Sequence, residues 1–146
     1  MIHKSLYSSR SEEWSTPLAL FKQLDEEFHF TLDPCATKEN AKCLRFFTSQ
    51  DDGLSQPWDG ERVFLNPPYG REIKKWIEKA AQARALTVAL IHARTDTRWW
   101  HDWVEQHAKE IRFIKGRVCF DGPHDAVNNP TNRPTFPSVL VIFDGR

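Results

Sequence analysis

No hydrophobic run in this sequence is long enough to cross a membrane as a helix. The most apolar stretches, residues 86–92 and 138–143, are far shorter than the roughly 20 residues that a membrane span requires. The first ten residues, MIHKSLYSSR, also lack the apolar core of a secretory signal peptide. We therefore expect a cytoplasmic protein that has no membrane contact.

The cysteine and histidine patterns of metal centres are missing as well. The three cysteines, Cys35, Cys43 and Cys119, are odd in number and form no CxxC pair. This pattern argues against a structural zinc site and fits a reducing compartment. The six histidines are scattered and none forms an HExxH motif, so we expect no metal.

The residues that are present describe an ordinary globular chain with uneven charge. Its 146 residues fit one domain, 1–146, in which residues 1–13 form a loose polar start. Residues 11–61 hold four basic and eleven acidic side chains, whereas residues 62–146 hold fourteen basic and nine acidic ones. A basic later part suits a polyanionic partner, although scatter among solvated side chains explains the count equally well.

Strand-like and helix-like segments alternate along the chain. This alternation predicts an α/β domain with a largely parallel sheet, and the apolar run 86–92 is typical of a strand buried on both faces. We expect helices that open at Thr16 and Pro17 and reach Phe28, and further ones over 39–44, 72–85 and 97–108. The expected strands cover residues 30–32, 62–65, 86–92, 111–114, 117–120 and 138–143.

Two of these strands end on unusual residues. One runs into Asp33-Pro34-Cys35-Ala36 and the other into Asn66-Pro67-Pro68-Tyr69. Ligands of α/β sheets bind beyond the carboxyl ends of the strands, so these two ends are the candidate site.

The second strand end suits an aromatic amine. The side-chain oxygen of Asn66 and the carbonyl of Pro67 are two close acceptors for an NH2 group, and the ring of Tyr69 is flat enough to stack on a heterocycle. Such acceptors would stabilise the positive charge that develops on the nitrogen during alkyl transfer. The alternative is a rigid strand-to-helix turn with a buried tyrosine.

The segment from Asn66 to Tyr69 also resembles the catalytic motif of S-adenosylmethionine-dependent amino-methyltransferases. The chain is similar, over about residues 12 to 143, to one branch of them, the compact phage and prophage Dam-like DNA N6-adenine methyltransferases. The other shared segments are Trp14-Ser15-Thr16-Pro17, Leu32-Asp33-Pro34-Cys35-Ala36, Asp52-Gly53-Leu54 with Trp58, Thr95-Asp96-Thr97 with Trp99-Trp100, Gly116-Arg117 and Phe136-Pro137-Ser138.

This resemblance implies a Rossmann-like methyltransferase fold, with a mostly parallel sheet and helices on both faces, in a minimal single domain. It implies methyl transfer from S-adenosylmethionine to adenine N6 in double-stranded DNA, on a base flipped out of the helix. Asn66, Pro67 and Tyr69 would be catalytic, and Pro68 would contact the substrate. The residues implied in cofactor binding are Thr16, Pro17, Asp33, Cys35, Ala36 and Asp52.

Several of these residues have a structural alternative. Thr16 and Pro17 also suit a helix cap, Asp33 a loop cap, and Asp52 a turn. Trp58 is expected in the core. Packing is the preferred explanation for Trp99, Trp100 and Trp103, with base stacking as the alternative.

Contacts to DNA are expected from two further segments. Arg94 and Arg98 flank a strand end and can meet phosphates, with Asp96 as a helix cap between them. The loop 121–137 offers Asn132 and Arg133 for base edges or phosphates.

The sequence departs from the wider methyltransferase pattern in two ways. The loop after the first strand has no glycine, and the chain has no room for a separate target-recognition domain. We therefore expect readout by loops from a monomer or a homodimer. Two alternatives remain open: an enzyme that methylates RNA or a protein glutamine, and a DNA-binding relative without activity. If a phage encodes the chain, we expect it in the host cytoplasm, in a restriction-modification context.

Overall fold

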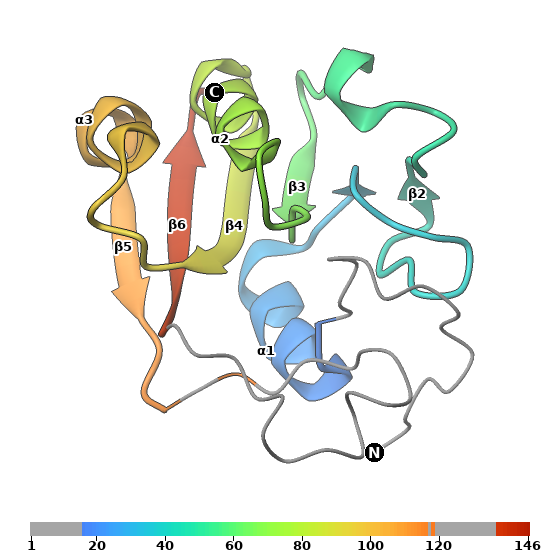
Figure 1. Cartoon of the computed structure of the whole chain (residues 1–146). Helices are drawn as coiled ribbons and strands as arrows, with labels where there is room; N and C mark the ends of the chain where they lie inside the picture. Colours follow the sequence, from blue (N-terminus) through green and yellow to red (C-terminus); the bar gives the residue numbers. More distant parts are fainter. Residues whose placement is uncertain (1–15, 117, 119–136) are drawn as a thin grey trace.

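The computed structural model describes residues 16–116, 118 and 137–146, and Figure 1 shows how their elements are arranged. Within these residues, six strands form one sheet and no helix is long and apolar enough to cross a membrane. The strands are β1 (Leu32–Asp33), β2 (Arg45–Phe46), β3 (Arg62–Leu65), β4 (Leu86–His92), β5 (Glu110–Phe113) and β6 (Ser138–Asp144). The helical segments are α1 (Leu18–Phe28), the 3-10 turn η1 (Gly53–Ser55), α2 (Ile73–Gln82), the π-helical turn η2 (Trp100–Val104) and α3 (Glu105–His107).

The sheet is mixed but mostly parallel. Its strand order is β2-β1-β3-β4-β6-β5, and the first four strands in this order run parallel to one another. Strand β6 runs antiparallel to both β4 and β5 and is the exception among the described strands. The expected α/β domain with a largely parallel sheet is thus confirmed, and the arrangement is consistent with a methyltransferase fold.

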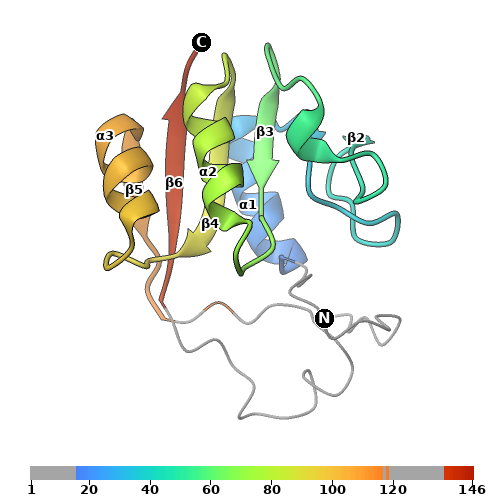
Figure 2. The same ribbon diagram turned by 45° about the horizontal axis from the view of Figure 1, so that its top comes forward.

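Helices cover both faces of this sheet (Figure 2). Strand β4 lies in the middle and, apart from its last residue, is buried throughout, because side chains alternate between two covered faces. Val88 and Leu90 pack in the cluster that contains the α1 residue Phe21. Ala89 and Ile91 pack in the cluster formed with α2 and η2.

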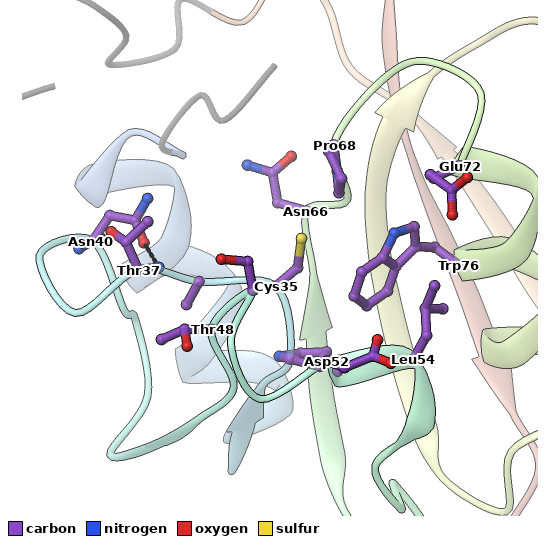
Figure 3. A pocket seen from close by; sticks show the side chains of 14 residues that line it. Cys35, Thr37, Asn40, Thr48, Asp52, Leu54, Asn66, Pro68, Glu72 and Trp76 are labelled. Carbon is purple, nitrogen blue, oxygen red and sulfur yellow. Dashed lines mark hydrogen bonds between the residues drawn. The ribbon is translucent and has the colours of Figure 1, made fainter. Parts of the chain in front are cut away.

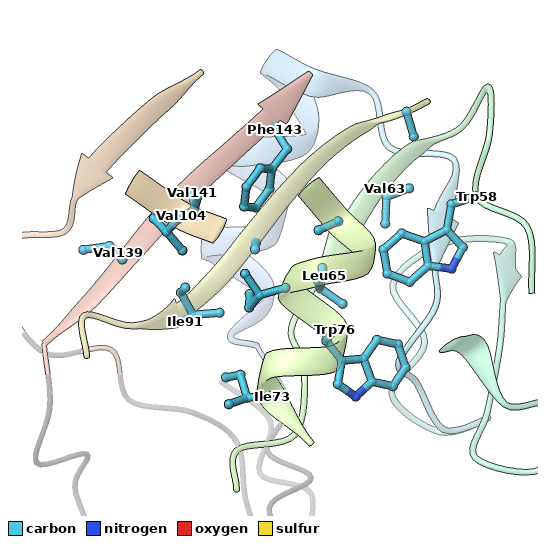
Figure 4. Packing of buried hydrophobic residues seen from close by; sticks show 14 of the residues in the cluster. Trp58, Val63, Leu65, Ile73, Trp76, Ile91, Val104, Val139, Val141 and Phe143 are labelled. Atoms are coloured by element: carbon cyan, nitrogen blue, oxygen red, sulfur yellow. The ribbon is translucent and has the colours of Figure 1, made fainter. Parts of the chain in front are cut away.

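The α2 face holds the larger core (Figure 4). Trp76 and Ile77 of α2 pack with Leu65 of β3 and Val141 of β6. Ile77 is fully buried, and burial of a side chain of this size stabilises the fold by about 1.5–3 kcal/mol. Helix α2 and strands β3, β4 and β6 therefore share one core behind the strand ends.

Helix α1 begins one residue later than the sequence predicts. Pro17 has extended backbone angles (φ −55°, ψ 136°) and is the N-cap, while Thr16 makes no capping bond to the helix. The expected cap at Thr16 is therefore wrong, because its hydroxyl is engaged outside α1. Leu18 is exposed, whereas Leu24 and Phe28 are buried.

The expected helix over 39–44 is wrong, and a strand follows instead. Thr37 and Asn40 exchange two side-chain-to-backbone hydrogen bonds of 2.7 and 3.2 Å, which make a tight turn. The backbone N–H of Lys42 then donates to the carboxylate of Asp33 over 3.0 Å. This bond takes a donor that a helix would need, and β2 follows beside β1.

Two predicted helices differ in detail from those observed. Helix α2 ends at Gln82 rather than at 85, because the carbonyls of Arg84 and Ala85 accept bonds from Gly60 and Gly145. The helical stretch after 97 contains the π-helical turn η2. The predicted strand 117–120 apart from Val118, the loop 121–137 apart from Pro137, and residues 1–13 lie outside the described residues.

The carboxyl ends of β1 and β3 meet at one edge of the sheet. These strands are parallel neighbours, with Leu32 opposite Val63. The residues that follow them, 34–37 and 66–69, are therefore placed side by side, as the two strand-end motifs require.

Candidate functional site

A cavity of about 260 Å³ opens at this edge of the sheet (Figure 3). The loop after β1, the segment that leads into η1, and the region from the end of β3 into α2 form its walls. The lining residues are 34–37, Asn40, 48–49, 52–54, Asn66, Pro68, Glu72 and Trp76.

Asp33 organises the loop after β1. Its carboxylate accepts hydrogen bonds from the backbone N–H groups of Lys42 (3.0 Å) and Cys35 (3.4 Å), and its carbonyl accepts one from Phe47. The residue is 4% exposed, and burial raises the pKa of its carboxyl group to about 6 despite these bonds. Asp33 does not line the cavity, so it shapes the wall from behind.

Cys35 and Ala36 themselves line the cavity. The backbone N–H of Ala36 donates to the carbonyl of Phe47 over 3.0 Å, which ties the loop to the end of β2. The loop thus holds its position without a glycine. Burial raises the pKa of the thiol of Cys43, outside the cavity, to about 12, so this cysteine stays protonated at neutral pH.

Asp52 lies on the opposite wall, just before η1. Its backbone is left-handed (φ 57°), and its carboxylate accepts a hydrogen bond from the hydroxyl of Ser55 over 3.0 Å. The turn that holds it is fixed at two successive carbonyls. Trp58 Nε1 donates to the carbonyl of Gly53 (3.0 Å), and Lys79 Nζ donates to that of Leu54 (2.9 Å).

Asn66 stands where β3 ends, in the wall of the cavity. Its amide nitrogen donates to the hydroxyl of Thr16 over 3.0 Å. Thr16 is 2% exposed and does not line the cavity, so the structure links it to the motif at Asn66. Pro17 is partly exposed at the start of α1 and is likewise absent from the cavity wall.

The rest of the motif is packed more tightly than its residue types suggest. Pro67 is buried, and Pro68 lines the cavity. The ring of Tyr69 lies against that of His92, with centroids 3.8 Å apart. Burial raises the pKa of Tyr69 above its usual range, and its hydroxyl has no hydrogen-bond partner among the described residues. Tyr69 is thus a neutral, partly buried ring.

The residues expected to meet DNA divide into two groups. Arg94 forms an ion pair with Asp96 at 3.4 Å, and Arg98 is exposed. The hydroxyl of Thr97 accepts a hydrogen bond from the N–H of Trp100, so Thr97 caps the helical segment that begins at Arg98 and continues into η2. The expected cap at Asp96 is therefore wrong. Asn132 and Arg133 lie outside the described residues.

Four tryptophans of the described residues, Trp58, Trp99, Trp100 and Trp103, are packing residues in this structure. Trp58 is 1% exposed, in agreement with its expected place in the core, and Trp100 is buried. Trp99 and Trp103 pack against the same cluster.

Sequence reasoning missed several side chains of the cavity wall, among them Trp76, Glu72, Asn40 and Thr48. Trp76 and Glu72 come from the start of α2, whereas Asn40 and Thr48 come from loops. Trp76 reads as a core residue at helical spacing, and its ring serves both the core and the cavity. A fourteen-residue wall with an aromatic ring, two carboxylates and two side-chain amides suits a ligand that has a flat ring, hydroxyl groups and charged ends. In the described part of the chain, no cluster of three or more His, Cys, Asp or Glu residues is placed to hold a metal.

The chain is similar in sequence to known proteins of one family. Residues 4–145 match the model of the DNA N-6-adenine-methyltransferase (Dam) family. A DNA N-6-adenine-methyltransferase of Haemophilus phage HP1 is 29% identical over 154 residues, which cover 99% of this chain and 85% of that protein. A second DNA N-6-adenine-methyltransferase, of Escherichia phage T1, is 31% identical over 74% of this chain and 47% of that protein.

Proposed function

The chain belongs to the DNA N-6-adenine-methyltransferase (Dam) family, whose activity is DNA N6-adenine methylation, and on this premise we propose how its residues divide the reaction. The cavity at the ends of β1 and β3 binds S-adenosylmethionine. The motif from Asn66 to Tyr69 holds an adenine flipped out of double-stranded DNA. The observation that carries this proposal is that Asn66 stands in the wall of the cavity at the end of β3.

Asn66 and Pro67 raise the reactivity of the adenine amine. The lone pair of N6 is delocalised into the ring, so the free amine is a poor nucleophile. The side-chain oxygen of Asn66 and the carbonyl of Pro67 accept hydrogen bonds from its two N–H groups and favour a tetrahedral nitrogen. They also stabilise the positive charge that develops there as the N–C bond forms. Bound S-adenosylmethionine would supply the methyl group from an electron-poor sulfur: its S–CH3 bond would break as the N–C bond forms, S-adenosylhomocysteine would leave, and the methylated nitrogen would then lose one proton. No covalent enzyme intermediate is needed.

The cavity wall fits the parts of this cofactor. The ring of Trp76 suits its adenine, and the carboxylates of Asp52 and Glu72 suit hydroxyl or amino groups. Cys35 and Ala36 lie across the cavity in the loop after β1. Asp33 acts through that loop rather than by contact.

The two alternatives from the sequence are less well supported. RNA or a protein glutamine offers a similar amine or amide, but the named relatives act on DNA adenine. A module without activity would have little use for an intact Asn66-Pro67-Pro68-Tyr69 motif beside a cavity.

The division of roles is tested by titration of S-adenosylmethionine into the protein by calorimetry. We expect Asp52→Asn to weaken binding about tenfold, or about 1.4 kcal/mol, and Asn66→Ala to bind like wild type while methyl transfer is lost. Glu78→Gln, which removes an exposed carboxylate of α2 outside the cavity, is the matched control. If all three variants bind alike, the cofactor does not occupy this cavity.

The biological setting is also part of the proposal. Two relatives come from phages, which supports protection of phage DNA from restriction in the host cytoplasm. Absence of N6-methyladenine from the DNA of the encoding element would count against it. We propose one methyltransferase domain over residues 1–146, active as a monomer or a homodimer. Activity measured against the mass of the species in solution distinguishes these two forms.

A further inference from the structure

The amide of Asn66 has a defined orientation in the structure. Its nitrogen donates to the hydroxyl of Thr16 over 3.0 Å, across 50 residues of sequence. In Figure 3 the amide oxygen of Asn66 lies on the side of Pro68 and the nitrogen points the other way. With its nitrogen bonded to Thr16, the amide presents its oxygen to the motif.

This orientation matters because only one end of an amide can serve an amine. An asparagine side chain can turn about its last bond and exchange oxygen and nitrogen at little cost in shape. The oxygen accepts a hydrogen bond from an NH2 group, whereas the amide NH2 opposes it donor to donor. A neighbour that accepts from the amide nitrogen therefore favours the reactive orientation.

We propose that Thr16 is a positioning residue for methyl transfer, which acts by holding the amide of Asn66 with its oxygen toward adenine N6. The assignment rests on the proposed function of Asn66. A hydroxyl can also donate, so Thr16 satisfies the amide in either orientation when the site is empty. When adenine is bound, the amine requires the amide oxygen, and the threonine oxygen then serves as the acceptor for the amide nitrogen.

Two other roles for Thr16 fit the structure less well. A helix cap is not observed, since α1 has Pro17 as its N-cap and no side-chain cap bond. A direct cofactor contact would require Thr16 in the cavity wall, where it does not lie. Its near-complete burial behind Asn66 agrees with a supporting position.

The test compares Thr16→Val, which keeps the shape and removes the hydroxyl, with Thr16→Ser, which keeps the hydroxyl. We measure kcat for methyl transfer to double-stranded DNA and the Kd for S-adenosylmethionine. Displacement of a group near the reacting atoms by about 1 Å can cost 10²-fold, so we expect the valine variant to lose roughly ten- to hundredfold in kcat. We expect its Kd to stay within about twofold of wild type, and the serine variant to recover most of the rate.

The unchanged Kd also reports that the valine variant is folded. A Kd that rises together with an unchanged kcat would overturn the proposal in favour of a cofactor contact. A rate equal to wild type would overturn it as well, and so would serine behaving like valine. Failure of the wild-type protein to methylate DNA would instead refute the proposed function.

A second readout observes the amide itself. In the nuclear magnetic resonance spectrum, the side-chain NH2 signal that disappears in Asn66→Ala belongs to Asn66. We expect its hydrogen-bonded proton to shift in Thr16→Val and to stay in place in Thr16→Ser. An Asn66 signal that is the same in wild type, Thr16→Val and Thr16→Ser would show that Thr16 does not hold the amide.

Discussion

The imidazole ring of His92 lies flat against the phenol ring of Tyr69, with centroids 3.8 Å apart and planes 11° apart. Tyr69 follows β3, and His92 is the last residue of β4, the parallel neighbour of β3. A contact of this kind fixes the orientation of the tyrosine ring. His92 is therefore a support for the ring to which the proposed function assigns the flipped adenine.

Replacement of His92 tests this support. Because His92→Ala removes the flat neighbour of Tyr69, we expect kcat for DNA methylation to fall about tenfold, or about 1.4 kcal/mol. His92→Phe keeps a flat ring and should retain most of the rate. Burial, followed by the nearby charge of Arg94, lowers the pKa of His92, so the ring is neutral at pH 7 and above. The ratio of the phenylalanine variant to wild type should thus be constant from pH 7 to 8. Alanine and phenylalanine variants of equal rate would contradict the supporting role.

Lys79 is predicted to stabilise the cavity wall although it does not line the cavity itself. Its ammonium group donates to the carbonyl of Leu54 and lies 5.2 Å from the ring centre of Trp58. In Lys79→Met this bond is lost, and we expect the Kd for S-adenosylmethionine to rise roughly three- to tenfold, since a net hydrogen bond contributes about 0.5–1.5 kcal/mol. Lys74→Met, an exposed change on the same helix, is the control. Calorimetric titration of the two variants decides, and equal Kd values would refute the effect.

Gly53 is predicted to be required by a close backbone contact. A Cβ atom at this position would lie 2.1 Å from the carbonyl oxygen of Pro34, which belongs to the opposite wall of the cavity. Neither group is a side chain that can turn away, so we expect Gly53→Ala to lower the free energy of unfolding by about 3 kcal/mol.

Gly60→Ala separates this clash from backbone strain. Gly60 has φ +80° and nothing within 4 Å of an added Cβ, so alanine there costs about 1 kcal/mol. Urea unfolding of both variants gives the comparison. A smaller loss for Gly53→Ala than for Gly60→Ala would show that the two walls are not in contact.

Asp33 is predicted to make stability depend on pH in an unusual direction. Its folded-state pKa is about 6, above the value of about 3.9 expected for the unfolded chain, so folding takes up a proton between these values. The contribution of Asp33 therefore rises as pH falls from about 6 to 4, at up to about 1.4 kcal/mol per pH unit. Asp33→Asn cannot take up this proton. As pH falls from about 6 to 4, the unfolding free energy of wild type should therefore increase relative to that of Asp33→Asn. Parallel pH curves for the two proteins would contradict the assignment.

The parts of the fold that sequence could predict are those set by local apolar runs. The strands at 62–65 and 86–92 were expected with the bounds observed, because such runs are buried wherever the sheet places them. The helix predicted over 39–44 does not form, because the carboxylate of Asp33 accepts a hydrogen bond from the N–H of Lys42. A bond between residues so far apart leaves no periodic signal.

The same limit applies to the site. Asn66, Cys35 and Ala36 could be placed at the cavity because they lie in motifs at strand ends, and Asp52 because its segment resembles one shared by the family. The bond from Asn66 to Thr16 could not be predicted, since it depends on how α1 approaches β3. Residues such as Trp76 and Glu72 belong to no motif, and their role emerges only when α2 packs beside the cavity.

The central claim is that Asn66 directs methyl transfer to adenine N6. The most direct measurement incubates wild type and Asn66→Ala with methyl-labelled S-adenosylmethionine and unmethylated double-stranded DNA, and then determines the mass of the released nucleosides. The account predicts labelled N6-methyladenine from wild type and a loss of at least about a hundredfold in Asn66→Ala, with cofactor binding intact. Equal amounts of N6-methyladenine from both proteins would contradict it.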